Sequence, residues 1–296
     1  MNAAEVAEVA EVLETDEVGG VARVQTPFDV SERRAWAGSA AAYEAGFGRL
    51  CTYPVPALLE AVGVGSGMRV LDVGTGPGSV AAAAGARGAE VVAVDAEPGM
   101  ARRAARAVPG ASVYIAELAR LPFRDSQFDA VVGNFVLNHV GRPRVALTEL
   151  RRVTRSGGRI AVTIWAAPAA SGQALLGRAV AAAGVPRPAD VPALAPEDDF
   201  PRTEDGLAAL LNEAGLVETG CRSLAWEHHT TAAEWWQGAA AGVATMGRIV
   251  TSQGAEGVER IRQQFALLAE EFADGHGGLV LPHRALLAYG RVHQTA

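Results

Sequence analysis

The sequence predicts an α/β fold built on a mostly parallel sheet with helices on both faces. From residue 68 onward, short and almost uninterrupted apolar runs alternate with helical segments, and such runs are typical of strands buried on both faces. The first run ends in the glycine-rich turn 74–78, and the second ends in Asp95. Because ligands bind beyond the carboxyl ends of parallel strands, both features are expected at one rim of the sheet.

The core elements are expected in a regular order. They are strand 68–73, helix 79–87, strand 90–95, helix 98–107, strand 112–115, strand 129–134, helix 143–153 and strand 158–165. A helix over 171–183, a helix over 205–214 with Thr203 as N-cap, and strands 217–226 and 284–292 follow. We expect two helices, about 231–247 and 255–274, between those last two strands, and a helix from Ser31 to Tyr43 with Ser31 as N-cap ahead of the core.

The composition excludes several classes of function. The 26 positive charges are all arginine and the net charge is −7, so we expect no binding to nucleic acid. Without lysine, neither a Walker phosphate loop nor a pyridoxal phosphate Schiff base can form. No apolar run reaches the ~18 residues that span a bilayer, and we expect no membrane partner.

The cysteines and histidines indicate no metal site. Cys51 and Cys221 fit neither a disulfide framework nor a metal-ligand spacing, and we expect reduced thiols and a cytoplasmic protein. His228 and His229 are adjacent on an extended segment, so their side chains are expected to face opposite ways.

The glycine-rich turn and Asp95 together indicate a nucleoside site. Asp95 follows Gly74 by 21 residues, and an acid at this place can accept both hydroxyls of a ribose. The dinucleotide pattern Gly-x-Gly-x-x-Gly has its third glycine where this chain has Ser79, which weakens a nicotinamide interpretation and leaves it open.

Five segments, in order along the chain, resemble the class I S-adenosylmethionine-dependent methyltransferases, in particular their UbiE-like small-molecule subgroup (methyltransferase type 11). The segments are Asp72 to Gly78, Asp95 to Met100, Glu117 to Val132, Phe135 to Val140 and Leu150 to Ile160. The resemblance implies a Rossmann-like, doubly wound, seven-stranded and mostly parallel sheet with an N-terminal helical lid and helical cap insertions. It also implies S-adenosyl-L-methionine as cofactor and S-adenosyl-L-homocysteine as its product.

The resemblance assigns roles to the residues at the rim. The cofactor-binding set that it implies is Tyr43, Asp72, Gly74, Gly76, Asp95, Ala96, Met100, Glu117, Leu118 and Asn134. In this set Asp95 accepts the ribose hydroxyls, Asn134 holds the amino-acid end, and the ring of Tyr43 lies over the sulfonium cation. The chain departs from the family at Glu117 and Leu118, where an aspartate and a small residue are usual.

The expected chemistry depends more on aligning the acceptor with the methyl group than on covalent catalysis. A methyl group on a sulfonium is already an activated electrophile, so the protein must chiefly position the acceptor and exclude water. His139 matches a common family position and can accept a proton from the acceptor, or it can instead fix local packing. Adjacent tryptophans on a helix point about 100° apart, so at most one of Trp235 and Trp236 can face a given pocket.

The substrate is predicted from aromatic side chains. The candidate substrate residues are Phe28, Trp36, Trp165, Trp235 and Trp236, with Phe265 beside them. They favour a hydrophobic, aromatic small molecule of specialised metabolism, methylated on carbon, nitrogen or oxygen. Two alternatives stay open: a cyclisation or rearrangement in which the cofactor is bound but unconsumed, and an NAD(P)-dependent oxidoreductase.

The expected organisation has six parts. They are a disordered acidic tail over 1–22, the lid over 23–65, the cofactor-binding core over 66–165, its continuation with a substrate-side insertion over 166–227, the helical cap over 228–282, and a last core strand and tail over 283–296. Both a monomer and a homodimer fit this organisation.

Overall fold

A mixed sheet forms the centre of the computed structural model, which describes residues 10–11 and 25–294. Its strands are β1 (Ala10–Glu11), β2 (Arg69–Val73), β3 (Glu90–Asp95), β4 (Ser112–Ile115), β5 (Phe128–Asn134), β6 (Thr154–Trp165), β7 (Leu216–Thr230) and β8 (Leu279–Val292). The seven predicted strands, β2 to β8, are confirmed, and the two-residue β1 adds a parallel edge beside β4. Apart from Ala10–Glu11, the acidic tail predicted over 1–22 lies outside the described residues.

The order of the strands confirms the doubly wound, mostly parallel topology. Across the sheet they run β1-β4-β3-β2-β5-β6-β8-β7. Only β8 runs in the direction opposite to the other strands. The winding reverses between β2 and β5, which are paired in parallel. The carboxyl ends of β2, β3, β5 and β6 therefore meet at one edge, which we call the crest.

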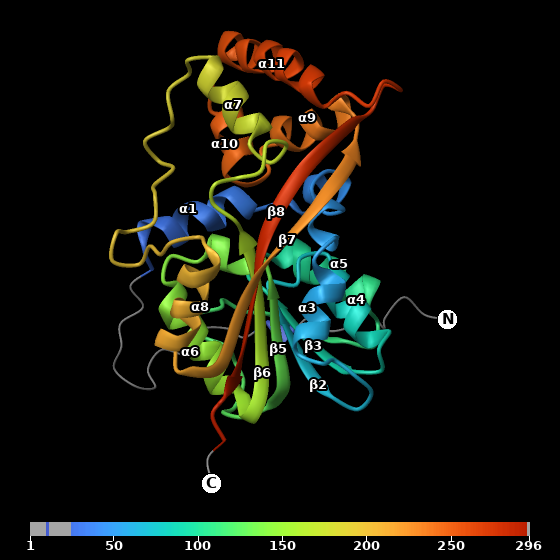
Figure 1. Ribbon diagram of the computed structural model, residues 1–296, viewed down its shortest axis with the longest axis vertical. Coiled ribbons are helices and arrows are strands. Elements are labelled where there is room, and N and C mark those ends of the chain that lie inside the picture. The colour runs from blue at the N-terminus through green and yellow to red at the C-terminus, as the bar shows by residue number, and fades with distance from the viewer. Residues whose placement is uncertain (1–9, 12–24, 295–296) are drawn as a thin grey trace.

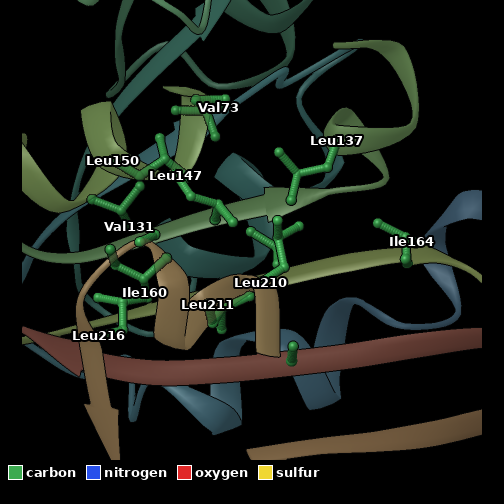
Figure 2. Packing of buried hydrophobic residues seen from close by; sticks show 14 of the residues in the cluster. Val73, Val131, Leu137, Leu147, Leu150, Ile160, Ile164, Leu210, Leu211 and Leu216 are labelled. Atoms are coloured by element: carbon green, nitrogen blue, oxygen red, sulfur yellow. The ribbon is translucent and has the colours of Figure 1, made fainter. Parts of the chain in front are cut away.

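Helices cover both faces of the sheet because their apolar sides match its buried strands. On one face lie α3 (Val55–Ala61), α4 (Ser79–Gly85) and α5 (Pro98–Ala107), with Leu58 and Leu59 fully buried. On the other lie α6 (Pro143–Val153) and α8 (Glu204–Glu213), the latter capped by Thr203 as predicted. Figure 2 shows leucines of α6 and α8 packed against Val131, Ile160 and Ile164 of the sheet.

The cap is a separate layer beyond the crest. From the predicted cap 228–282 it contains α9 (Ala232–Ala240), α10 (Ala244–Thr251), α11 (Ala255–Ala269) and the 3-10 turn η3 (Glu270–Phe272). It also contains α7 (Leu175–Ala182), from the segment 166–227, which packs on α11. In Figure 1, β7 and β8 run as one long ribbon from the sheet to these helices. Their pairing continues to Thr230 and Leu279, so both strands are longer than predicted.

Two helix predictions were wrong in their boundaries. The helix predicted over 231–247 is two helices, because the chain turns at Gly242 (φ +78°) between α9 and α10. The lid helix does not begin at Ser31: α1 (Pro27–Trp36) begins earlier, with Thr26 as N-cap, and α2 (Ala40–Ala45) follows it. Thr26 Oγ1 accepts from Asp29 N at 3.1 Å, and Pro27 suits the first helical position.

The lid lies between the sheet and the cap (Figure 1) and is bonded to both. Arg248 of α10 donates to the Ser31 carbonyl at 3.0 Å and to its hydroxyl at 2.6 Å. On the other side, Gly141, just after the 3-10 turn η2 (Val136–His139), donates its N–H to Asp29 at 2.6 Å. The turn η1 (Leu50–Thr52) then leads into α3.

Candidate functional site

The glycine turn after β2 is shaped by two different requirements. Gly74 (φ +65°) and Gly76 (φ +56°) both have left-handed backbone, which favours glycine. A Cβ on Gly74 would lie 2.5 Å from Cγ2 of Val136, so close packing against η2 also excludes a side chain there. At Gly76 the nearest atom is Cε1 of Tyr43 at 3.9 Å, so its backbone faces the lid without being crowded.

Asp95 joins the ends of the first two central strands. Its carboxylate accepts from Gly76 N at 2.8 Å and from Glu97 N at 2.9 Å. Burial raises the pKa of Asp95 to about 6, although those two backbone bonds act in the opposite direction. Each oxygen keeps a lone pair beyond these bonds, which suits a ligand that donates hydroxyl groups.

Asp72 is the second carboxylate at the crest and is fully buried. Thr75 Oγ1 donates to its Oδ2 at 2.6 Å, whereas Oδ1 has no hydrogen-bond partner in the described part of the chain. Burial raises the pKa of Asp72 to about 7. A glycine turn flanked by two carboxylates with spare acceptor capacity fits a nucleoside that carries hydroxyl and ammonium donors.

The remaining predicted cofactor residues lie at the same rim and differ in how far they are buried. Ala96 is exposed, while Met100 is buried and donates its N–H to Glu97 at 2.6 Å. Leu118 is partly buried, and the exposed Glu117 pairs with Arg33 of the lid at 2.5 Å.

Asn134 links the end of β5 to the lid. Its Nδ2 donates to the Cys51 carbonyl at 2.7 Å, and its Oδ1 accepts from Thr163 Oγ1 at 2.7 Å. One of its two N–H groups is left for a ligand. Nearby, Tyr43 lies edge-on to Trp36 with ring centroids 5.5 Å apart. Burial raises the pKa of the Tyr43 phenol well above 10, so it remains protonated.

His139 forms a dyad with a lid residue that the sequence interpretation missed. Its Nδ1 lies 2.7 Å from Oε2 of Glu32, whose side chain is only 8% exposed. Burial acts to raise the Glu32 pKa, but hydrogen bonds from His139, Trp36 and Thr245 outweigh it and hold that pKa below its usual value. In the tautomer that donates its Nδ1–H to Glu32, the lone pair of His139 is at Nε2.

The sequence contains a weak signal that Glu32 lies beside Trp36. It stands four residues before Trp36 and so shares a face of α1 with it, and Trp36 Nε1 donates to Oε2 of Glu32 at 3.3 Å. The signal for partnership with His139 is absent, because the two residues are 107 positions apart and meet only through the fold.

The predicted substrate residues separate into different places. Trp165 stacks on Phe135 with centroids 4.0 Å apart, at the ends of β6 and β5. Trp235 is buried and faces Phe47 and His228, whereas Trp236 packs against Phe265 inside the cap. Phe28 is partly buried near the start of α1, and it stays a prediction as a substrate contact.

The described residues contain neither a metal-ligand cluster nor a membrane-spanning helix. In residues 10–11 and 25–294, no three His, Cys, Asp or Glu side chains are grouped so that they could hold a metal ion. His228 is buried and His229 exposed, as expected from their alternation. Within the same ranges, none of the helices combines the length and apolar character of a membrane span.

Comparison with known proteins gives a consistent result. A family model described as a methyltransferase domain matches residues 71–162. A demethylmenaquinone methyltransferase of Beutenbergia cavernae is 35% identical over 176 residues, covering 57% of this chain and 73% of that protein. One from Mycolicibacterium paratuberculosis is 41% identical over 110 residues, but these span 37% of this chain and only 46% of that relative.

Solved structures share the fold at low sequence identity. The YcgJ protein of Bacillus subtilis is 17% identical with a TM-score of 0.53, covering 81% of this chain and 98% of its own. A Haemonchus contortus phosphoethanolamine N-methyltransferase 2 in complex with S-adenosylhomocysteine is 14% identical with a TM-score of 0.53, covering 90% of this chain and 60% of its own. The chain therefore belongs to the S-adenosylmethionine-dependent methyltransferase family, and S-adenosylmethionine, in place of a nicotinamide dinucleotide, is its cofactor.

Proposed function

We propose that this methyltransferase acts on a hydrophobic, aromatic small molecule of specialised metabolism. The observation that carries the proposal is the set of rings on either side of the crest. Trp36 and Tyr43 lie on the lid side, and the stacked Phe135 and Trp165 lie on the sheet side. Flat apolar rings in these positions favour a planar acceptor over a charged polymer.

The cofactor would be held by the crest residues. Asp95 would accept from the ribose hydroxyls, the backbone at Gly74 and Gly76 would pass close to the methionine portion, and Asn134 would contact the amino-acid end. Further contacts would come from Tyr43, Asp72, Ala96, Met100, Glu117 and Leu118. When bound, S-adenosylmethionine supplies a methyl group already activated by its sulfonium.

His139 would serve as the general base for an oxygen or nitrogen acceptor. Glu32 fixes its Nδ1–H, which leaves Nε2 to take the proton from the acceptor. Nε2 of His139 would hold the proton that the acceptor releases as it is methylated. The 29% exposure of the His139 side chain leaves Nε2 a route to a ligand.

The decisive experiment is an acceptor screen. Purified protein, S-adenosylmethionine and a panel of phenols, aromatic amines and electron-rich rings are incubated, and products are sought by mass spectrometry at a gain of about 14 Da per methyl. Demethylmenaquinone belongs in the panel because of the relatives' name. One S-adenosylhomocysteine formed per product supports methyl transfer. A new product without the gain of about 14 Da, formed without S-adenosylhomocysteine, would instead support the rearrangement alternative.

A further inference from the structure

A cluster of tryptophan and histidine rings lies where the sheet, the lid and the cap meet. We call it the histidine–tryptophan cluster; its members are Tyr53, Trp165, Trp226, His228, Trp235 and His283. His283 is central, with ring centroids 5.4 Å from Trp235 and 6.0 Å from each of Trp165, Trp226 and His228. Tyr53 stacks on Trp226 at 5.6 Å. Trp165 connects the cluster to Phe135 and so to the crest.

The alternation of the β7–β8 hairpin defines which residues belong to the cluster. Trp226 pairs with His283 across the two strands, and His228 follows two residues later on the same face. A cavity of about 540 Å³ borders the hairpin, and Trp226 and His283 of the cluster line it together with Glu227 and Arg284. The cavity therefore gives a ligand access to two rings of the cluster.

The cluster contains buried polar atoms without partners. Nε1 of Trp226, Nε1 of Trp235 and Nδ1 of His228 have no hydrogen-bond partner among the residues that the structure describes. Trp235 is 5% exposed and His228 is 3% exposed. The two indole Nε1 atoms are donors, and a buried donor without an acceptor is costly, so hydrophobic packing alone does not explain both in one cluster.

His283 supplies an acceptor among these donors. Its Nδ1 lies 2.8 Å from the Leu281 carbonyl, which can only accept, so Nδ1 carries the proton and Nε2 carries the lone pair. Burial lowers the pKa of His283 to about 4 and also lowers that of His228. At neutral pH both rings are uncharged, and His283 can hold a hydroxyl group without removing its proton.

We propose that the histidine–tryptophan cluster is the acceptor-binding site, and that its ligand is an oxygenated planar aromatic ring. A carbonyl or ether oxygen accepts from the indole N–H groups, and a phenolic hydroxyl donates to Nε2 of His283. The ring occupies the cavity that Trp226 and His283 line. This inference rests on the proposed methyl transfer and narrows its acceptor, because a hydrocarbon ring would leave the buried indole donors unpaired.

Three probes of similar size test the ligand chemistry on protein saturated with S-adenosylhomocysteine. They are 7-hydroxycoumarin, coumarin and naphthalene, with dissociation constants measured by equilibrium dialysis. Each hydrogen bond gained should tighten binding about fivefold, so the expected order is 7-hydroxycoumarin, then coumarin, then naphthalene. Equal binding of all three, or binding of none, would overturn the inference.

Adjacent tryptophans provide matched variants. Trp235→Phe keeps a ring but removes the indole N–H, and it should weaken 7-hydroxycoumarin about fivefold while leaving naphthalene unchanged. Trp236→Phe removes the N–H of a ring that packs against Phe265 outside the cluster, and it should change neither constant. The same loss in both variants would contradict the assignment. Calorimetry with S-adenosylhomocysteine separates the two proposals, because a wild-type protein that does not bind it fails the proposed function itself.

Discussion

The two halves of the crest are built in different ways. Over β2 and β3, the proposed site is made by residues close in sequence. At the ends of these neighbouring strands, the backbone N–H of Gly76 donates to the carboxylate of Asp95. Over β6, β7 and β8, it is made by side chains from the lid, the sheet and the cap, such as Tyr53, Trp226 and His283. A backbone-built half suits a fixed cofactor, and a half built from side chains suits a variable acceptor.

The comparison predicts that chemistry and cofactor binding can be separated, most clearly at His139. Replacing it by alanine should lower turnover of an oxygen or nitrogen acceptor about 100-fold or more, because the general base is lost. Affinity for S-adenosylhomocysteine, measured by calorimetry, should stay unchanged. A parallel loss of cofactor affinity and melting temperature would show that His139 serves packing instead.

The backbone-built half should tolerate no side chain at Gly74. Gly74→Ala should destabilise the protein by about 2 to 3 kcal/mol more than Gly67→Ala, measured by urea denaturation. Both glycines have positive φ, but nothing lies within 4 Å of a Cβ on Gly67, whereas one on Gly74 would meet Val136. Equal destabilisation would mean that η2 moves aside at little cost.

Loss of the Asp95 carboxylate should weaken cofactor binding by more than the loss of one ordinary hydrogen bond. Asp95→Ala should weaken S-adenosylmethionine binding by roughly 2 kcal/mol or more, about 30-fold, because buried hydroxyls lose a charged acceptor. Calorimetry measures the change, and acceptor-probe affinity serves as the control. Unchanged cofactor affinity would remove Asp95 from the site.

The raised pKa of Asp95 predicts a pH dependence confined to the cofactor half. With a pKa of about 6, the carboxylate is ionised at pH 7 and protonated at pH 5, where one oxygen can no longer accept freely. Affinity for S-adenosylmethionine should therefore fall about tenfold from pH 7 to pH 5. Asp95→Asn should reduce this dependence, and the slope that remains is expected from Asp72, whose pKa of about 7 lies in the same range. An unreduced slope would exclude Asp95 as its source.

The smallest expected effect on turnover is that of Glu32, which would act on the acceptor through His139. Glu32→Gln should lower turnover about tenfold, because the charge that fixes the His139 tautomer is lost. In a His139→Ala background the same substitution should add nothing to the loss. Additive losses measured in this double-mutant cycle would separate Glu32 from the proton transfer.

The same comparison explains what could be predicted from sequence. Asp72, Gly74 and Asp95 were found because a strand, a tight turn and the next strand place them by local rules. The seven strands followed from apolar runs of the same kind. Glu32, His228 and His283 were not assigned roles, because their partners are distant in sequence and only the lid and the long hairpin bring them together. The Gly242 turn was missed because one glycine within a helical pattern is a weak signal.

The bonds from α10 to the lid have a consequence for the catalytic cycle. Arg248 holds Ser31, and Thr245 donates to Glu32 at 3.3 Å, so α10 and α1 are bonded to each other. Glu32 also contacts His139, and a movement of α10 away from α1 would therefore remove one of the bonds that fix the Glu32 carboxylate. Under the proposed mechanism, we expect proton transfer to be fastest when α10 and α1 are in contact.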